Sequence, residues 1–382
     1  MRLYQLTSRA LVATMLFSSV AVGQSGRWTQ QKADAWYARQ PWLVGANYAP
    51  ANAINQIEMW QADTFDPKQI DKELGWAAGI GMNTMRVFLH DLVWQQDPEG
   101  YRKRLDQFLT IAQKHGVRTM FVLFDSVWDP FPAVGKQRDP KPGVHNSGWV
   151  QGPGLKALQD PAQERRLEAY VKGVVGAFAK DRRVLAWDIW NEPDNPNTSA
   201  YGEVELRNKN DLVLPLLRKS FAWARAADPQ QPLTSGLWHH PDWSSLEKLT
   251  PIERVQVEES DVISFHSYDS PETFHDRILQ LVGYNRPLLC TEYMARGNNS
   301  TFAGSLPIAK EYNVAAYNWG LVQGKTQTHL PWDSWKQPYV GGREPTVWFH
   351  EVFRPDGTAY RPNELELIRK VTGKSKAIRK AA

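Results

Sequence analysis

The 382 residues contain one cysteine, Cys290. A single cysteine excludes an internal disulfide, so a large buried core has to stabilise the protein in an oxidising compartment. Cys290 ends the apolar run that begins at Pro287, and we expect it to pack inside the core. The chain is long enough for one large core or for two smaller domains.

The sequence also lacks an excess of charge of one sign. It has 45 Lys and Arg against 41 Asp and Glu, a formal net charge of +4, and these residues are spread along the chain. The basic tail from Arg369 to Lys380 is interpreted as a solvated end. Because no basic stripe or nucleic-acid motif accompanies the charge, we expect no nucleic-acid partner.

Long hydrophobic runs are missing as well, apart from one near the N-terminus. Arg2 and Arg9 precede the apolar stretch Ala10–Val22, which is too short for a comfortable membrane anchor. Small residues at 21–23 suit a signal peptidase, so the sequence predicts a signal peptide over residues 1–23 and one domain over 24–382. We therefore expect export to the periplasm or the extracellular space, with no membrane partner.

Short apolar runs alternate with amphipathic stretches along the rest of the chain, as in βα units with a parallel sheet. The runs of strand length are Leu43–Asn47, Thr84–Leu89, Thr119–Phe124, Leu185–Trp190, Leu233–Leu237, Val262–Phe265, Leu288–Thr291 and Val314–Trp319. The stretches of helical pattern are Pro67–Gly79, Pro98–Gly116, Pro161–Lys180, Glu205–Ala227, Ser244–Leu249, Pro271–Val282, Gly304–Tyr312 and Pro362–Thr372. The pattern at Ser244–Leu249 is the weakest of these.

Eight strands with eight helical stretches predict an α/β protein, a single-domain (β/α)8 TIM barrel with long βα loops. A doubly wound open sheet is the alternative. It would favour a glycine-rich phosphate turn after the first strand, and Gly45-Ala46-Asn47 is not such a turn. The long connections 125–160 and 320–347 both follow strands, on the face where a barrel builds its active site.

Tryptophan is abundant, with 17 residues. A flat apolar ring beside hydrogen-bonding groups suits the C–H face and the hydroxyl rim of a sugar. The tryptophans near polar residues or glycine are Trp128, Trp149, Trp190, Trp238, Trp319, Trp332 and Trp335. Core packing is the alternative for each of them, and we expect it to hold for about half of the tryptophans.

The segment from Trp187 to Pro193, Trp-Asp-Ile-Trp-Asn-Glu-Pro, is the strongest local signal for chemistry. An apolar strand ends in Asn191 and Glu192, and Pro193 prevents the strand from continuing. The carboxyl ends of barrel strands line the active site, so this position favours a catalytic Glu192 over a surface salt-bridge partner.

Glu292 follows the apolar run that begins at Pro287 in the same way. Because Glu192 and Glu292 end the fourth and seventh predicted strands, both carboxylates can face one pocket. Cleavage of a glycosidic bond needs two carboxyl groups across the bond, about 5–5.5 Å apart where the configuration is retained. A salt-bridged residue on the rim is the alternative for Glu292 taken alone.

Asn191-Glu192-Pro193 at the fourth strand, with Glu292 at the seventh, resembles glycoside hydrolase clan A, and most closely family 5, the cellulase and mannanase family. The resemblance covers the whole mature chain. It includes Arg86 at the second strand, His266-Ser267-Tyr268 at the sixth and Trp319 at the eighth. The stretch from Asn47 to Trp60 also resembles bacterial proteins described as cellulase-like or xylanase-like.

The resemblance implies a retaining hydrolase of β-glycosidic bonds with Glu192 as acid/base and Glu292 as nucleophile. It further implies that Asn191 binds the sugar 2-hydroxyl, that Arg86 and Tyr268 orient the nucleophile, and that His266 and Trp319 lie at the substrate. A β-linked oligo- or polysaccharide is then the expected partner of a monomer.

One position departs from the family pattern. Family 5 usually has a histidine near the end of the third strand, whereas this chain has Asp125 there. Either Asp125 or His90, after the second strand, is expected to fill that space. Asp125 with Trp128 and Trp238 with His239 are also candidate substrate contacts, with ordinary loop structure as the alternative.

The chemistry sets requirements on the two glutamates. Glu192 must be protonated to donate to the leaving oxygen, so we expect apolar neighbours such as Trp190 and the charge of Glu292 to raise its pKa. Glu292 must be ionised, which Arg86 would favour by charge and Tyr268 by a hydrogen bond.

No cofactor or metal is expected. His239 and His240 are adjacent, so they would point apart on a strand, and no carboxylate spacing completes a metal site. Two other functions stay open: a non-catalytic carbohydrate-binding barrel, and a transglycosylase that uses the same covalent intermediate. Endo or exo action also stays open, although the long third and eighth loops could close a cleft into a pocket.

Overall fold

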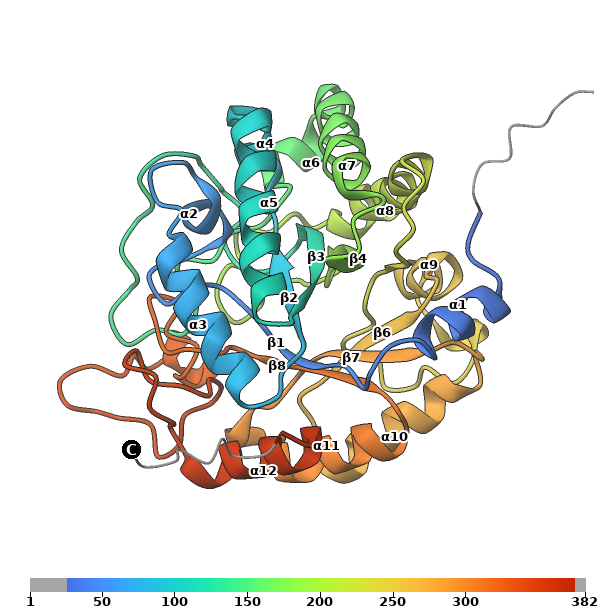
Figure 1. The fold of residues 1–382 in the computed structure, drawn as a ribbon. Helices are drawn as coiled ribbons and strands as arrows, with labels where there is room; N and C mark the ends of the chain where they lie inside the picture. The colour runs from blue at the N-terminus through green and yellow to red at the C-terminus, as the bar shows by residue number, and fades with distance from the viewer. Residues whose placement is uncertain (1–25, 375–382) are drawn as a thin grey trace, which may run out of the picture.

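The computed structural model describes residues 26–374, in which one eight-stranded parallel sheet is surrounded by helices (Figure 1). The strand order is β5-β4-β3-β2-β1-β8-β7-β6, which confirms the predicted barrel. The strands are β1 Val44–Asn47, β2 Thr84–Phe88, β3 Arg118–Asp125, β4 Val184–Asn191, β5 Leu233–Thr234, β6 Ile263–Ser267, β7 Leu288–Tyr293 and β8 Ala315–Trp319.

The barrel closes between β5 and β6 through a single bridge. We predicted that the fifth strand would reach Leu237, but it ends at Thr234. The reason is that a side chain takes the place of a strand-to-strand hydrogen bond at Ser235. The Ser235 N–H donates to Ser260 Oγ at 3.1 Å. The backbone pairs again at Leu237, whose N–H donates to Ser264 at 3.0 Å and whose carbonyl accepts from His266 at 2.8 Å.

Helix α3, Pro67–Gly79, begins where the sequence places its cap. Asp66 accepts hydrogen bonds from the backbone N–H groups of Lys68 and Gln69, and Pro67 occupies the first turn of α3. The longer helices are α1 Gln30–Tyr37, α3 Pro67–Gly79, α5 Pro98–Lys114, α7 Glu164–Phe178, α8 Lys209–Ala226, α9 Pro251–Glu259, α10 Pro271–Val282, α11 Phe302–Glu311 and α12 Pro362–Thr372. Short helices are α2 Gln56–Trp60, α4 Asp91–Gln96 and α6 Leu155–Gln159.

The helix predicted at Ser244–Leu249 is wrong. That stretch holds only a 3-10 turn, Leu246–Lys248, and the helix between β5 and β6 is α9. Its start has a capping box: Thr250 Oγ1 accepts from the Glu253 N–H, and the Glu253 carboxylate accepts from the Thr250 N–H. This signal was present in the sequence and was missed.

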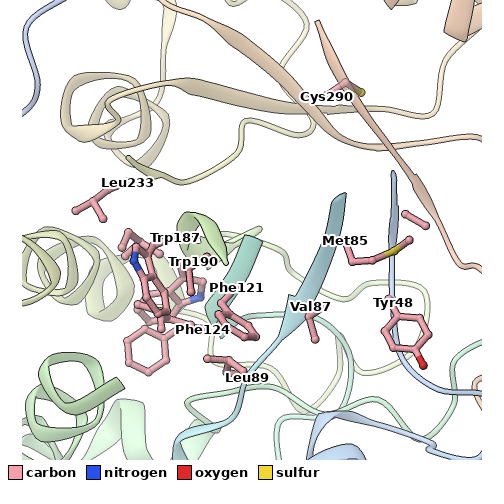
Figure 2. Packing of buried hydrophobic residues seen from close by; sticks show 14 of the residues in the cluster. Tyr48, Met85, Val87, Leu89, Phe121, Phe124, Trp187, Trp190, Leu233 and Cys290 are labelled. Atoms are coloured by element: carbon pink, nitrogen blue, oxygen red, sulfur yellow. The ribbon is translucent and has the colours of Figure 1, made fainter. Parts of the chain in front are cut away.

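Aromatic residues of β3 and β4 fill the layer between the barrel and its helices. Phe121 packs on Trp187 with ring centroids 5.7 Å apart, and Phe124 packs on Trp190 at 5.0 Å (Figure 2). Cys290 of β7 is fully buried, as expected. This packing fixes β4 and thereby the residues at its carboxyl end.

Two long loops meet above the carboxyl ends of the strands. We call residues 126–154, between β3 and α6, the third loop and residues 320–361, between β8 and α12, the eighth loop. Trp128 stacks on Trp335 across them with ring centroids 5.6 Å apart. His145 Nδ1 lies 2.8 Å from the Leu330 carbonyl. Each loop therefore holds the other in place.

The predicted signal peptide, residues 1–23, lies outside the described residues. Among residues 26–374, no helix has the length and apolar character that crossing a membrane requires.

The close approach of β1 to β2 requires glycine at position 45. Gly45 pairs with Thr84, and a Cβ at Gly45 would lie 1.8 Å from the Thr84 carbonyl oxygen. Gly45→Ala should therefore lower the free energy of unfolding by about 1–3 kcal/mol, measured by urea denaturation. Gly79→Ala, where a Cβ would meet nothing within 4 Å, is the matched control. Equal stability of the two variants would contradict this account of the strand contact.

Candidate active site

Glu192 is the first residue after β4, and its backbone turns sharply. Its φ is 43°, in the left-handed region that costs a residue with a side chain about 1–3 kcal/mol. Its Oε1 lies 2.8 Å from His266 Nδ1, and its Oε2 accepts a hydrogen bond from Asn195 Nδ2 at 2.6 Å. Both carboxylate oxygens are thus held while the residue lines the central cavity.

Glu292 lies within β7 and is held by a cation and a phenol. Arg86 Nη1 donates to its Oε1 at 2.8 Å, and the Tyr268 hydroxyl donates to its Oε2 at 2.7 Å. The pairing of β7 with β8 shifts register between Cys290 and Tyr293, around this residue. Glu292 therefore has a fixed orientation toward the cavity.

Arg86 connects four elements of the site from β2. Its Nε and Nη2 donate to Asp188 Oδ2 at 3.0 and 2.8 Å, and its Nη1 also donates to Asn47 Oδ1 at 2.7 Å. Nη2 donates to Asn191 Oδ1 at 2.7 Å. Since Arg86 is fully buried, these carboxylate and amide oxygens are its partners in place of water.

The two glutamates face each other closely. One carboxylate oxygen of Glu192, one of Glu292 and one ring nitrogen of His266 all lie within 4.8 Å of one another. Among the residues described, only this group has donor atoms that could converge on a metal ion. The guanidinium of Arg86, 2.8 Å from Glu292, would repel a cation placed there.

Burial is the largest influence on the titration of Glu192. It raises the pKa of Glu192 to about 7, against a hydrogen bond from Asn195, and the charge of Asp194 acts in the same direction as burial. We expected the charge of Glu292 to be the acidic contribution; Asp194 is the acidic neighbour among the largest influences on Glu192, and the repulsion between the two glutamates acts on the pKa of Glu292.

Burial also raises the pKa of Glu292, but more groups oppose the shift. His266 in its protonated form, Arg86 and the hydrogen bond from Tyr268 lower this pKa, and the charge of Glu192 raises it. Burial lowers the pKa of His266 to about 4, so its imidazole is neutral near pH 7. Glu192 therefore lacks a direct cationic partner, whereas Glu292 has Arg86.

Asp125 is the last residue of β3 and lies against Asn191. Its Oδ1 accepts from Asn191 Nδ2 at 2.9 Å, and its Oδ2 accepts from Trp149 Nε1 at 2.6 Å. His90 instead caps α4 by accepting from the Leu92 N–H. Asp125 is buried and is absent from the cavity wall, so it orients Asn191, where we had expected a substrate contact.

The cavity between the strand ends and the loops has a volume of about 240 Å³. The predicted site residues that line it are Asn191, Glu192, Tyr268, Glu292, Trp128, Trp238 and Trp319. Arg86 and His266 lie directly behind the glutamates. His239 stacks on Trp238 and lines a neighbouring hollow, with Nε2 3.9 Å from Asp194.

A family model described as Cellulase (glycosyl hydrolase family 5) matches residues 45–337. The chain belongs to glycosyl hydrolase family 5. The match runs from β1 into the eighth loop and includes both glutamates.

Two curated relatives match shorter parts of this family 5 chain. Mannan endo-1,4-beta-mannosidase F of Aspergillus clavatus is 22% identical over 134 residues, 35% of this chain and 26% of that protein. Mannan endo-1,4-beta-mannosidase A of Emericella nidulans is 28% identical over 91 residues, 24% of this chain and 21% of that protein. The matched segments thus span about a quarter or less of those relatives.

Solved structures resemble the family 5 chain over most of its length. An exo-beta-1,4-mannosidase from Opitutaceae bacterium strain TAV5 has a TM-score of 0.58 at 18% identity, covering 88% of this chain and 60% of its own. A variant of GH5_18 from Streptomyces cattleya, in complex with Manb1-4GlcNAc, has a TM-score of 0.56 at 13% identity, covering 89% and 82%. At these identities the likeness shows the fold alone.

Sequence reasoning missed several residues of this family 5 site. A signal existed for Asp188, because the buried arginine expected at position 86 needs a carboxylate and Asp188 is the only acidic residue in the apolar strand before Glu192. Asn195, Asn146 and His350 carried no such signal. Their places depend on how the loops fold over the barrel.

Arg86→Ala should destabilise the protein strongly. It leaves the buried carboxylates of Asp188 and Glu292 without their cation, at a cost of about 3–5 kcal/mol in the free energy of unfolding. Urea denaturation measures this loss. Arg102→Ala, which removes an exposed pair with Glu99, is the control and should cost about 0–1 kcal/mol. Similar losses in both variants would contradict the central role of Arg86.

Proposed function

We propose that the chain is a retaining β-glycoside hydrolase that works by double displacement. The observation that carries this proposal is the pair Glu192 and Glu292, with one oxygen of each within 4.8 Å. Retaining enzymes hold their carboxyl groups about 5–5.5 Å apart, whereas inverting enzymes need about 6.5–9.5 Å to admit a water molecule. The nearest carboxylate oxygens of the two residues thus lie closer together than the separation that an inverting pair needs, which favours direct attack by a carboxylate on the sugar.

In the first step Glu292 is the nucleophile. Its carboxylate bonds to the anomeric carbon while the bond from that carbon to the leaving oxygen breaks, and Glu192 donates its proton to this oxygen. Arg86 and Tyr268 align the attacking carboxylate. The pKa of Glu192, which burial raises to about 7, keeps much of this group protonated near neutral pH.

In the second step Glu192 is the base. Once Glu292 is esterified to the sugar its negative charge is gone, so the charge repulsion between the two groups disappears and Glu192 ionises more readily. Glu192 then takes a proton from water, which attacks the anomeric carbon and releases Glu292 as a carboxylate. Two inversions at the same carbon give net retention.

We propose β-linked, mannose-containing saccharides as the substrate class. The support comes from the names of both curated relatives and of the Opitutaceae structure. The aromatic wall of the cavity, with Trp128, Trp238 and Trp319, suits the apolar face of a sugar ring. A non-catalytic sugar-binding barrel would not need two carboxylates within 4.8 Å. Transglycosylation shares the first step and differs in the acceptor.

Azide should distinguish the roles of the two glutamates. With 2,4-dinitrophenyl β-mannoside, Glu292→Ala should lose at least about a thousandfold in kcat, and azide entering the vacated space should restore turnover as the α-mannosyl azide. Glu192→Ala with azide should instead give the β-azide, because Glu292 still forms the intermediate. NMR of the products reads the configuration, and aryl β-glucoside serves as the comparison sugar. Unchanged hydrolysis by Glu292→Ala would disprove the proposal.

The pH profile should report the acid. Only protonated Glu192 can donate, so kcat/KM for a poor leaving group should fall about tenfold per pH unit above its pKa of about 7. Glu192→Gln cannot titrate, so its residual activity on the dinitrophenyl substrate should stay level from pH 6 to 8. An alkaline limb that persists in Glu192→Gln would assign it to another group.

A further inference from the structure

Two buried polar side chains line the cavity without hydrogen-bond partners. They are Asn146, whose Oδ1 and Nδ2 both lack a partner, and His350, whose Nε2 lacks one, among residues 26–374. Each residue is 1% exposed. A buried polar atom left unpaired is destabilising, so three such atoms on one cavity wall point to a polar ligand.

The hydrogen-bonding character of His350 follows from its other nitrogen. Nδ1 lies 2.6 Å from the Met294 carbonyl oxygen, which can only accept, so Nδ1 carries a proton. Burial lowers the pKa of His350 well below its ordinary value, so the ring is neutral and Nε2 is an acceptor. Asn146 offers an acceptor and two donors. Sugar hydroxyls, which both donate and accept, match this set.

The contact between the loops fixes Asn146 in place. The Asn146 N–H donates to the Thr326 carbonyl at 2.7 Å, so the eighth loop holds its backbone. The backbone of Asn146 has a positive φ of 47°. The neighbouring His145 packs against Trp128 at 6.2 Å and against His350 at 5.5 Å between ring centroids. Asn146 of the third loop and His350 of the eighth thus belong to one rigid wall.

The positions of Glu192 and Glu292 indicate which sugar of the substrate lies against Asn146 and His350. Glu192 protonates the leaving oxygen, so the leaving group lies on its side, where Asn195 and Trp238 line the cavity. Tyr268, which holds Glu292, packs on His350 with ring centroids 5.5 Å apart. His350 therefore lies next to the group that holds Glu292, and the third and eighth loops, joined at His145, form the cavity wall there.

We propose that Asn146 and His350 bind hydroxyls of a terminal sugar in a pocket that the joined loops close, so that the protein releases single sugars from chain ends. This inference rests on the proposed function and specifies its mode of action. Asn146 and His350 are positioning residues for the glycone: they fix the sugar at Glu292 and exclude a further sugar behind it.

The variants separate hydrogen bonding from packing. Asn146→Gly removes the amide and tolerates the positive φ, and Asn285→Gly, at φ 53° on the surface, is its matched control. His350→Asn retains a donor where Nδ1 meets Met294 and loses the acceptor at the Nε2 position. His350→Gln retains an acceptor near the Nε2 position.

The assay uses mannotetraose reduced at one end and follows products and kinetics together. We expect mannose as the first product, and a loss of about tenfold or more in kcat/KM, mainly through KM, for Asn146→Gly and His350→Asn. Asn285→Gly should match the parent protein, and His350→Gln should retain more activity than His350→Asn.

Three results would overturn the inference while the proposed function stands. One is early release of mannobiose or longer unreduced products. The others are a kcat/KM of Asn146→Gly within twofold of that of Asn285→Gly, or equal losses of kcat/KM in His350→Asn and His350→Gln. The last result would mean that the histidine contributes only packing. Absence of cleavage of every β-glycoside by the parent protein would instead contradict the proposed function itself.

Discussion

The buried guanidinium of Arg86 is the group on which the geometry of the site depends. It donates to Asp188 and Glu292, which balance its charge, and to Asn47 and Asn191, which carry the network to β1 and to the end of β4. A lysine could supply the charge but not this planar set of donors. One side chain thus fixes three strands relative to Glu292, before any substrate is bound.

The same network makes Glu192 and Glu292 differ in how readily each holds a proton. Both are buried, and burial alone raises the pKa of each. Glu292 lies against the cation of Arg86 and the hydroxyl of Tyr268, whereas Glu192 meets a neutral His266 and an amide. A carboxyl group without a cationic contact holds its proton more readily than one beside a guanidinium. This asymmetry of the partners is the difference that the proposed acid/base and nucleophile roles require.

The sequence predicts the barrel and the central residues because both follow from local patterns. Strand-length apolar runs place Glu192 and Glu292 at carboxyl ends and Arg86 within the second strand, and a parallel barrel brings all the carboxyl ends to one face. What the sequence does not predict also has physical reasons. A two-residue β5 depends on side-chain bonds of Ser235 to other elements, and Asn146 is placed by the Thr326 carbonyl far along the chain. Hydrophobic periodicity carries no information on contacts between distant segments, so the positions of loop residues cannot be predicted from it.

The division between strands and loops also explains how the site combines family chemistry with an individual shape. Solved structures at 13% and 18% identity match this fold with TM-scores of 0.56 and 0.58, so few residues are needed to keep the barrel. The loops are free to vary, yet here two of them lock together and leave buried polar atoms of Asn146 and His350 unpaired. Folding alone would favour apolar side chains at such positions, because an unpaired buried amide is destabilising. A cost of that kind is expected where a ligand supplies the missing partners, and His350 lies beside Tyr268, which holds Glu292.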